Sequence, residues 1–148
     1  MDWTGGCLCG AVRFRAMAAA SRVVSCHCGM CRRHSGAAFL TFVHFPAAAF
    51  TWLEREPTRY RSSAEAERGF CARCGSTLSM HETVIEDFVQ VTLGSLDRPG
   101  DVRPDDHVWT EDQLPWLKIE DDRPRFPRNS SAVPSRAPGA RQGDMQRD

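Results

Sequence analysis

Apolar and polar residues alternate along much of this chain, and this pattern predicts strands. Over residues 12–16, apolar side chains alternate with two arginines, and over residues 89–93 they alternate with Gln90 and Thr92. A period of two places one face of a strand in a core and the other in solvent. Shorter apolar runs predict further strands at residues 22–25, 38–45, 50–53, 58–61, 76–80 and 107–109.

Helical periodicity is weak by comparison. Only residues 31–35 and 47–50 predict helices, and both would be short. Glycines and prolines between residues 94 and 104 interrupt the chain before its last apolar segment. We therefore predict an all-β domain built from curled antiparallel sheets, with metal-binding clusters where hairpins meet.

The composition predicts one domain and a tail. A chain of 148 residues is long enough for one hydrophobic core, which we assign to residues 1–127. Over residues 128–148, Val133 and Met145 are the only larger apolar side chains. These are too few to offset the entropy lost on ordering this segment. We expect residues 128–148 to form a disordered tail.

Charge and apolar content disfavour two classes of partner. Lys and Arg total 19 and Asp and Glu total 19, so no overall field attracts nucleic acid. No apolar stretch approaches the roughly 20 residues that span a bilayer. The first residues lack the basic and apolar regions of a secretory signal. We therefore expect a cytoplasmic protein that binds neither membranes nor nucleic acid.

The seven cysteines lie in three clusters with the spacing of metal ligands. The clusters are the pairs Cys7 with Cys9 and Cys71 with Cys74, and the triplet Cys26, Cys28 and Cys31. Alternate residues of an extended segment point to one side, and a Cys-x-x-Cys turn brings two sulfurs together. Disulfides are disfavoured because the clusters are tight, the total is odd and the cytosol is reducing. A thioredoxin-like motif at 71–74 lacks the helical pattern that should follow it.

Each cluster also contains a glycine, at position 10, 29 or 75. A chain that folds around an ion turns sharply after its second ligand, and glycine adopts the required positive φ without steric cost. Backbone N–H groups can then face the sulfurs and stabilise their negative charge. The glycines therefore favour metal binding independently of the cysteine count.

The spacing also predicts how the ligands divide. The triplet can present its sulfurs to one ion from a single loop, whereas each pair needs a partner from distant sequence. We predict that the two pairs form a closed structural zinc site of four thiolates. The triplet keeps a vacant position for solvent, a substrate, His27 or His34. A histidine there would make the second site closed and structural as well.

An open zinc ion held by three thiolates favours a thiol as its guest. It is a softened Lewis acid that still lowers the pKa of a bound thiol. Arg32 and Arg33 are candidates to bind the carboxylates of a small thiol such as glutathione. Candidates to carry the proton are His27, His34 and His107.

We hypothesise that the bound thiolate attacks an electrophilic carbonyl held beside it. The protein would contribute orientation and a lowered thiol pKa. Trp109 and Trp116 are candidates for the wall of the cleft, or for the core.

Three motifs in this order closely resemble the glutathione-dependent formaldehyde-activating enzyme family, which includes centromere protein V. They are residues 5–14, with both cysteines of the first pair, residues 26–33, with the triplet, and residues 70–76, with the second pair. Later motifs at 94–97, 107–109, 115–116 and 121–124 extend the resemblance to residue 127.

The resemblance implies a β-tent fold with two zinc ions, one structural at the two cysteine pairs and one catalytic at the triplet. It also implies condensation of formaldehyde with glutathione to S-hydroxymethylglutathione, classed as a carbon-sulfur lyase reaction in the reverse direction. We therefore expect a zinc-dependent carbon-sulfur lyase that acts on the adduct of a small thiol with an aldehyde.

Two other functions stay open on the sequence alone. The first is a non-catalytic zinc-stabilised module that binds a protein, in which both metals are structural. The second, a nucleic-acid-binding zinc protein, is disfavoured by the balanced charge and by the lack of a basic helix after the cysteines.

Overall fold

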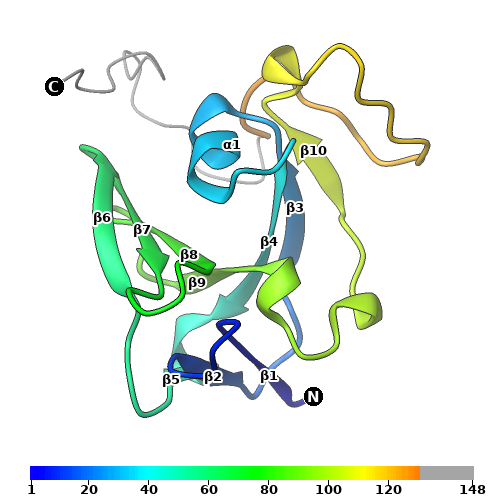
Figure 1. The fold of residues 1–148 in the computed structure, drawn as a ribbon. Coiled ribbons are helices and arrows are strands. Elements are labelled where there is room, and N and C mark those ends of the chain that lie inside the picture. Colours follow the sequence, from blue (N-terminus) through cyan, green and yellow to red (C-terminus); the bar gives the residue numbers. More distant parts are fainter. Residues whose placement is uncertain (131–148) are drawn as a thin grey trace, which may run out of the picture.

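The computed structural model describes residues 1–130, and their ten strands form two sheets of unequal size (Figure 1). The small sheet has the order β1-β2-β5 and consists of Trp3–Gly6, Arg13–Ala16 and Phe50–Trp52. The large sheet has the order β10-β3-β4-β9-β8-β7-β6. In chain order its strands are β3 (Arg22–Cys26), β4 (Leu40–Pro46), β6 (Thr58–Ser63), β7 (Ala66–Phe70), β8 (Thr77–Glu82), β9 (Phe88–Thr92) and β10 (Asp106–Val108).

The prediction of an all-β fold is confirmed, with one correction to the sheet type. β10 pairs with β3 in parallel, whereas the other neighbours in both sheets are antiparallel. A parallel pair needs a long connection, and these two strands lie far apart in the sequence. The large sheet is therefore mixed.

The helices are short. The α-helix α1 spans Gly29–Ser35, and the 3-10 helices are η1 (Ala47–Ala49), η2 (Leu93–Ser95), η3 (Pro99–Asp101) and η4 (Thr110–Asp112). α1 begins two residues before its predicted start because the Cys28 side chain caps it, and it ends at Gly36, whose φ is 70°. Within residues 1–130, no helix has the length and apolar content needed to cross a bilayer.

Every predicted strand is present, but two observed strands were not predicted. β1 contains two glycines, and β7 carries charged residues and a glycine, so neither shows an apolar alternation. Both are held by their neighbours: β1 pairs with β2, and β7 lies between β6 and β8. Both strands thus form because they pair with neighbouring strands, although their own sequences show little preference for strand.

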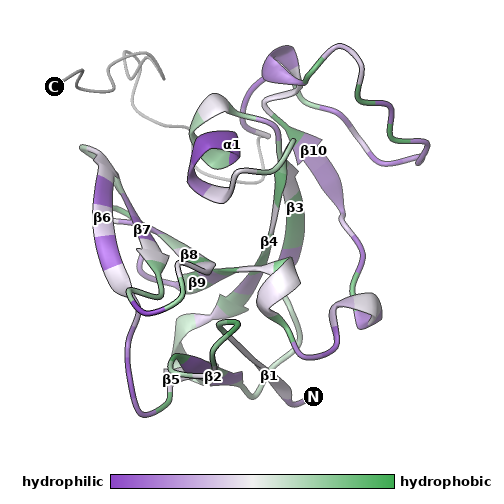
Figure 2. Cartoon of the chain, in the orientation of Figure 1, coloured by the Kyte–Doolittle hydropathy of each residue, from purple (hydrophilic) through white to green (hydrophobic). Residues whose placement is uncertain are grey.

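One face of the large sheet packs on the small sheet and forms the main core. Register aligns Val23, Val43 and Val91 across β3, β4 and β9. These valines pack with Phe14 of the small sheet and with Phe45. The apolar colour along β3 and β4 contrasts with the polar edge strand β6 (Figure 2).

The opposite face is also covered, which the alternation in β9 did not predict. Gln90 and Thr92 were expected to face solvent, yet both are buried. The face beneath α1 forms a second core with α1 residues Met30 and Cys31, and α1 lies above this face in Figure 1. The prediction failed because a helix from distant sequence shields these polar side chains.

The chain after η4 returns along β10. His107 N donates to Pro124 O at 2.9 Å, and Phe126 N donates to His107 O at 2.8 Å. Ser130 is buried and accepts a hydrogen bond from Arg22 Nη2 at 2.7 Å. The first residues of the predicted tail thus contact the domain, and residues 131–148 lie outside the described part.

We predict that Phe45→Ala destabilises the protein strongly. Phe45 is fully buried in the main core, so truncation leaves a cavity and lowers the free energy of unfolding by about 3–5 kcal/mol. The control Tyr60→Ala removes an exposed ring from β6 and should cost less than about 1 kcal/mol. Urea denaturation of both variants measures the difference, and equal costs would contradict this packing.

Candidate metal centres

The two cysteine pairs meet at one point between the sheets. Cys7 and Cys9 lie in the turn between β1 and β2, and Cys71 and Cys74 lie in the turn between β7 and β8. The four sulfurs lie within 4.8 Å of one another. The Cys7–Cys9 and Cys9–Cys71 separations are 3.6 and 3.8 Å. In a tetrahedral site with Zn–S bonds of about 2.3 Å, sulfurs lie about 3.8 Å apart, so this cluster fits one zinc ion.

The backbone around the four-sulfur cluster is shaped for anionic sulfur. Gly10 and Gly75 adopt φ of 78° and 75°, as the turn argument requires. Val12 N donates to the Cys7 sulfur at 3.2 Å. The third glycine prediction was wrong, because Gly29 begins α1 and has no positive φ.

The triplet forms a second, fully buried cluster. Cys26 ends β3, Cys28 caps α1 and Cys31 lies in its first turns. The three sulfurs lie within 4.8 Å of one another. Within residues 1–130 this group of ligand atoms includes no histidine nitrogen or carboxylate oxygen. The structure therefore brings three sulfurs together here and gives neither His27 nor His34 a place among them.

Charge in the triplet is shared among the thiols and one arginine. Thiol hydrogen bonds from Cys26, then from Cys31, lower the pKa of Cys28, and the Arg68 charge acts in the same direction. The hydrogen bonds with Cys28 and Cys31, and then burial, raise the pKa of Cys26. Arg68 Nη1 donates to the Cys31 sulfur at 3.5 Å. Because three thiolates and one divalent cation carry a single net negative charge, Arg68 balances a metal-loaded triplet.

A cavity of about 40 Å³ adjoins the triplet. Cys26, Cys28 and Cys31 are among the residues that line this cavity. Its floor is a row of directly opposed residues that crosses the large sheet, namely Arg22, His44, Gln90, Met80 and Arg68. We call these five residues the floor row. A water needs about 10–15 Å³ on this measure, so the cavity admits about three waters or a small molecule.

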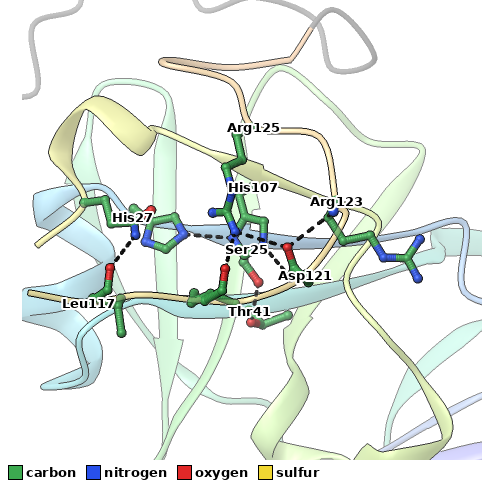
Figure 3. Close-up of polar contacts among 10 residues, drawn as sticks. Ser25, His27, Thr41, His107, Leu117, Asp121, Arg123 and Arg125 are labelled. Atoms are coloured by element: carbon green, nitrogen blue, oxygen red, sulfur yellow. Dashed lines mark hydrogen bonds and ion pairs between the residues drawn. The ribbon is translucent and has the colours of Figure 1, made fainter. Parts of the chain in front are cut away.

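A chain of three polar side chains begins in the loop that carries the triplet (Figure 3). His27 Nε2 is 2.9 Å from His107 Nδ1, and His107 Nε2 is 2.9 Å from Asp121 Oδ2. Arg125 pairs with Asp121 at 3.1 Å, and the hydrogen bond from His107 lowers the pKa of Asp121. This chain ties the returning segment to the triplet loop.

None of the three predicted proton carriers, His27, His34 and His107, is among the residues that line the cavity. The histidine that does line it is His44, which sequence reasoning missed. The sequence feature that could have identified His44 is the alternation of β4, which places His44 on the same face as Phe42.

Comparison with known proteins adds the family. Residues 2–112 match the model described as glutathione-dependent formaldehyde-activating enzyme. The chain belongs to this family. It is 34% identical over 77 residues to the uncharacterized lyase C29B12.13 of Schizosaccharomyces pombe, a match that covers 52% of this chain and 56% of that protein. The chain thus matches little more than half the length of that relative.

A solved structure shows the same fold. It is the crystal structure of a Rhodobacter sphaeroides protein, Northeast Structural Genomics target RhR83, with a TM-score of 0.50 and 18% identity. The similarity covers 83% of this chain and 98% of that protein. The β-tent fold expected for a formaldehyde-activating family member is therefore present.

The structure bears on the arginines and tryptophans singled out in the sequence. Arg32 Nη1 donates to the carbonyl oxygens of His27 and Asp112, so it fixes the triplet loop. Neither Arg32 nor Arg33 lines the cavity, and binding of a glutathione carboxylate by Arg33 stays a prediction. Trp109 does line the cavity, as expected for a cleft wall. Trp116 is 69% exposed and belongs neither to the cavity nor to the core.

We predict different outcomes for loss of metal ligands in the two clusters. Cys71→Ser should leave the protein largely unfolded, because a structural zinc contributes about 10–16 kcal/mol and the four-sulfur cluster joins two hairpins. Cys28→Ser should keep the fold and lose one of two bound metal ions. Native mass spectrometry and circular dichroism report both. Unfolding of Cys28→Ser with Cys71→Ser still folded would reverse the roles.

We also predict an acid-labile contribution from His44. Burial, and then the charge of Arg22, lowers the pKa of His44 to about 3, below the value of about 6.5 in an unfolded chain. Its stabilising contribution is present above pH 6.5 and is lost as the pH falls, because the unfolded chain binds the proton first. Between pH 7 and pH 5, the wild type should lose about 1–2 kcal/mol more than His44→Gln.

Urea denaturation at the two pH values measures this difference. His81→Asn, on the neighbouring strand β8, is the control for loss of an imidazole and should retain the wild-type loss. Parallel pH dependence in the wild type and His44→Gln would rule out a neutral buried His44.

Proposed function

We propose that this protein is a zinc-dependent carbon-sulfur lyase that cleaves the adduct of a small thiol with an aldehyde, and that forms this adduct in the opposite direction. Glutathione and formaldehyde are the substrates that the family description suggests. The name of the Schizosaccharomyces pombe relative, a lyase, supports the reaction class. The seven cysteines are free thiols, which suits a reducing cytoplasm rich in small thiols.

The observation that carries the proposal is the position of the triplet. Cys26, Cys28 and Cys31 form a group of three sulfurs and also line the adjoining cavity. The four-sulfur cluster has a complete tetrahedral ligand set and supports a structural role. The triplet has three sulfurs and supports an open, catalytic role. When bound there, zinc would offer a site for the substrate sulfur and lower the pKa of its thiol.

The chain supplies confinement around this site. The cavity, of about 40 Å³, accepts a sulfur and a small aldehyde but not the body of a tripeptide. The rest of a glutathione molecule would lie outside it. Trp109 and Asn129, which line the cavity and are joined by a 2.9 Å hydrogen bond, are suited to contact that outer part.

A thiol-binding experiment tests the proposal. The zinc-loaded protein is studied by X-ray absorption with and without glutathione, and formation of S-hydroxymethylglutathione is followed by exchange NMR. We expect glutathione to raise the average sulfur coordination and the protein to accelerate exchange. Cys28→Ser should lose at least about 100-fold of the rate, since it removes one of three ligands. An imidazole already completing the second site, with no response to thiols, would instead indicate a protein-binding module.

A further inference from the structure

Arg68 is a buried cation with one unsatisfied donor. It lies on β7 with 2% of its surface exposed. Nη1 donates to the Cys31 sulfur at 3.5 Å and Nε donates to Ser62 Oγ at 3.1 Å. Nη2 is buried and has no hydrogen-bond partner within residues 1–130. A guanidinium cannot lose its proton to relieve this cost, so a buried N–H without an acceptor indicates a missing partner.

The cavity is where that partner can enter. Arg68 lines it at one end of the floor row. His44 Nε2, from the same row, is also buried without a partner within residues 1–130. The other cation of the row, Arg22, already has partners, because it pairs with Asp106 at 2.7 Å and donates to Ser130. The open hydrogen-bonding capacity thus lies at Arg68 and His44.

We propose that Arg68 Nη2 binds the carbonyl oxygen of a small aldehyde and stabilises the negative charge that forms on this oxygen. This inference rests on the proposed function, and it names the residue that would stabilise the substrate oxygen in that reaction. Nη1 contacts the Cys31 sulfur and Nη2 is the donor without a partner within residues 1–130, so in this proposal one guanidinium serves both the nucleophile and the electrophile.

The step balances without further reactants. A lone pair of the substrate thiolate forms the C–S bond, and the C=O π pair moves to oxygen, which Arg68 holds as an alkoxide. The proton that the thiol released to solvent returns to this alkoxide through water, which gives the hydroxyl group of the hydroxymethyl thioether. In the lyase direction the hydroxyl loses its proton, the C=O bond re-forms and the C–S bond breaks to release thiolate and aldehyde.

The charge balance of the site favours the neutral oxygen of an aldehyde over a permanently charged carboxylate as the partner of Arg68. A metal-loaded triplet with Arg68 is neutral, and Arg22 is balanced by Asp106. Glu82 already adds a carboxylate to the lining. A second permanent anion, a ligand carboxylate, would therefore be uncompensated in a buried site. A neutral carbonyl enters without that cost and becomes charged only as the C–S bond forms, when Arg68 acts most strongly.

Formamide tests the binding site without catalysis. It is a small neutral molecule with a carbonyl oxygen. In the zinc-loaded wild type, formamide should shift the Nε–H signal of Arg68 in ¹H–¹⁵N NMR, and chloride should not. An unshifted Arg68 signal at saturating formamide would overturn the inference, and this measurement needs no variant.

Kinetics of Arg68→Gln test the catalytic role. We expect a loss of about 100-fold or more in kcat, the usual effect of removing an oxyanion donor, with glutathione still bound at the triplet by X-ray absorption. Arg61→Gln is the control, because it removes the same charge from an exposed residue of β6. If Arg68→Gln does not fold, the formamide titration of the wild type decides alone.

The outcomes separate the two proposals. Wild-type turnover by Arg68→Gln would overturn the role of Arg68 and leave the lyase function intact. A wild-type protein that binds no glutathione and accelerates no exchange would overturn the lyase function and with it the catalytic role of Arg68, even if formamide shifts the Arg68 signal.

Discussion

Polar groups with little solvent exposure must find partners, and this requirement shapes the edge of the large sheet at β3 and β10. Arg22 meets it through Asp106 and Ser130. His27 meets it in part through His107. Each contact joins β3 or the triplet loop to β10 or to the segment that returns beside it. Satisfying these groups therefore also fixes the last described part of the chain against the site.

The two sulfur clusters connect different distances along the chain, and this difference supports the different roles proposed for them. The four-sulfur cluster joins the β1–β2 turn of the small sheet to the β7–β8 turn of the large sheet. The triplet is local, within β3, the loop and α1, so a metal there adds little to the closure of the fold. Metal affinity at the triplet is thereby available for binding a guest, and a vacant position does not endanger the domain.

The cavity beside the triplet combines soft sulfur with hard hydrogen-bond donors. Cys31 and Arg68 are in contact, so the proposed nucleophile side and the proposed oxygen side of a carbonyl addition meet within one small space. Confinement strengthens the electrostatic interactions of such a site. This pairing supports the proposed reaction class better than the cysteines alone, which would serve equally in a structural zinc module.

The sequence by itself determined the candidate metal ligands and most strands, because cysteine spacing and the period-two alternation are local properties of the chain. It also predicted that the two pairs and the triplet would separate, and the fold places their sulfurs accordingly. Tertiary structure decided the rest. The glycine- and charge-containing strand β7 forms only through its neighbours, and the burial of Gln90 depends on a helix from distant sequence. Arg68 and His44 became site residues because strand register placed them in one row, and register is set by pairing rather than by any single segment.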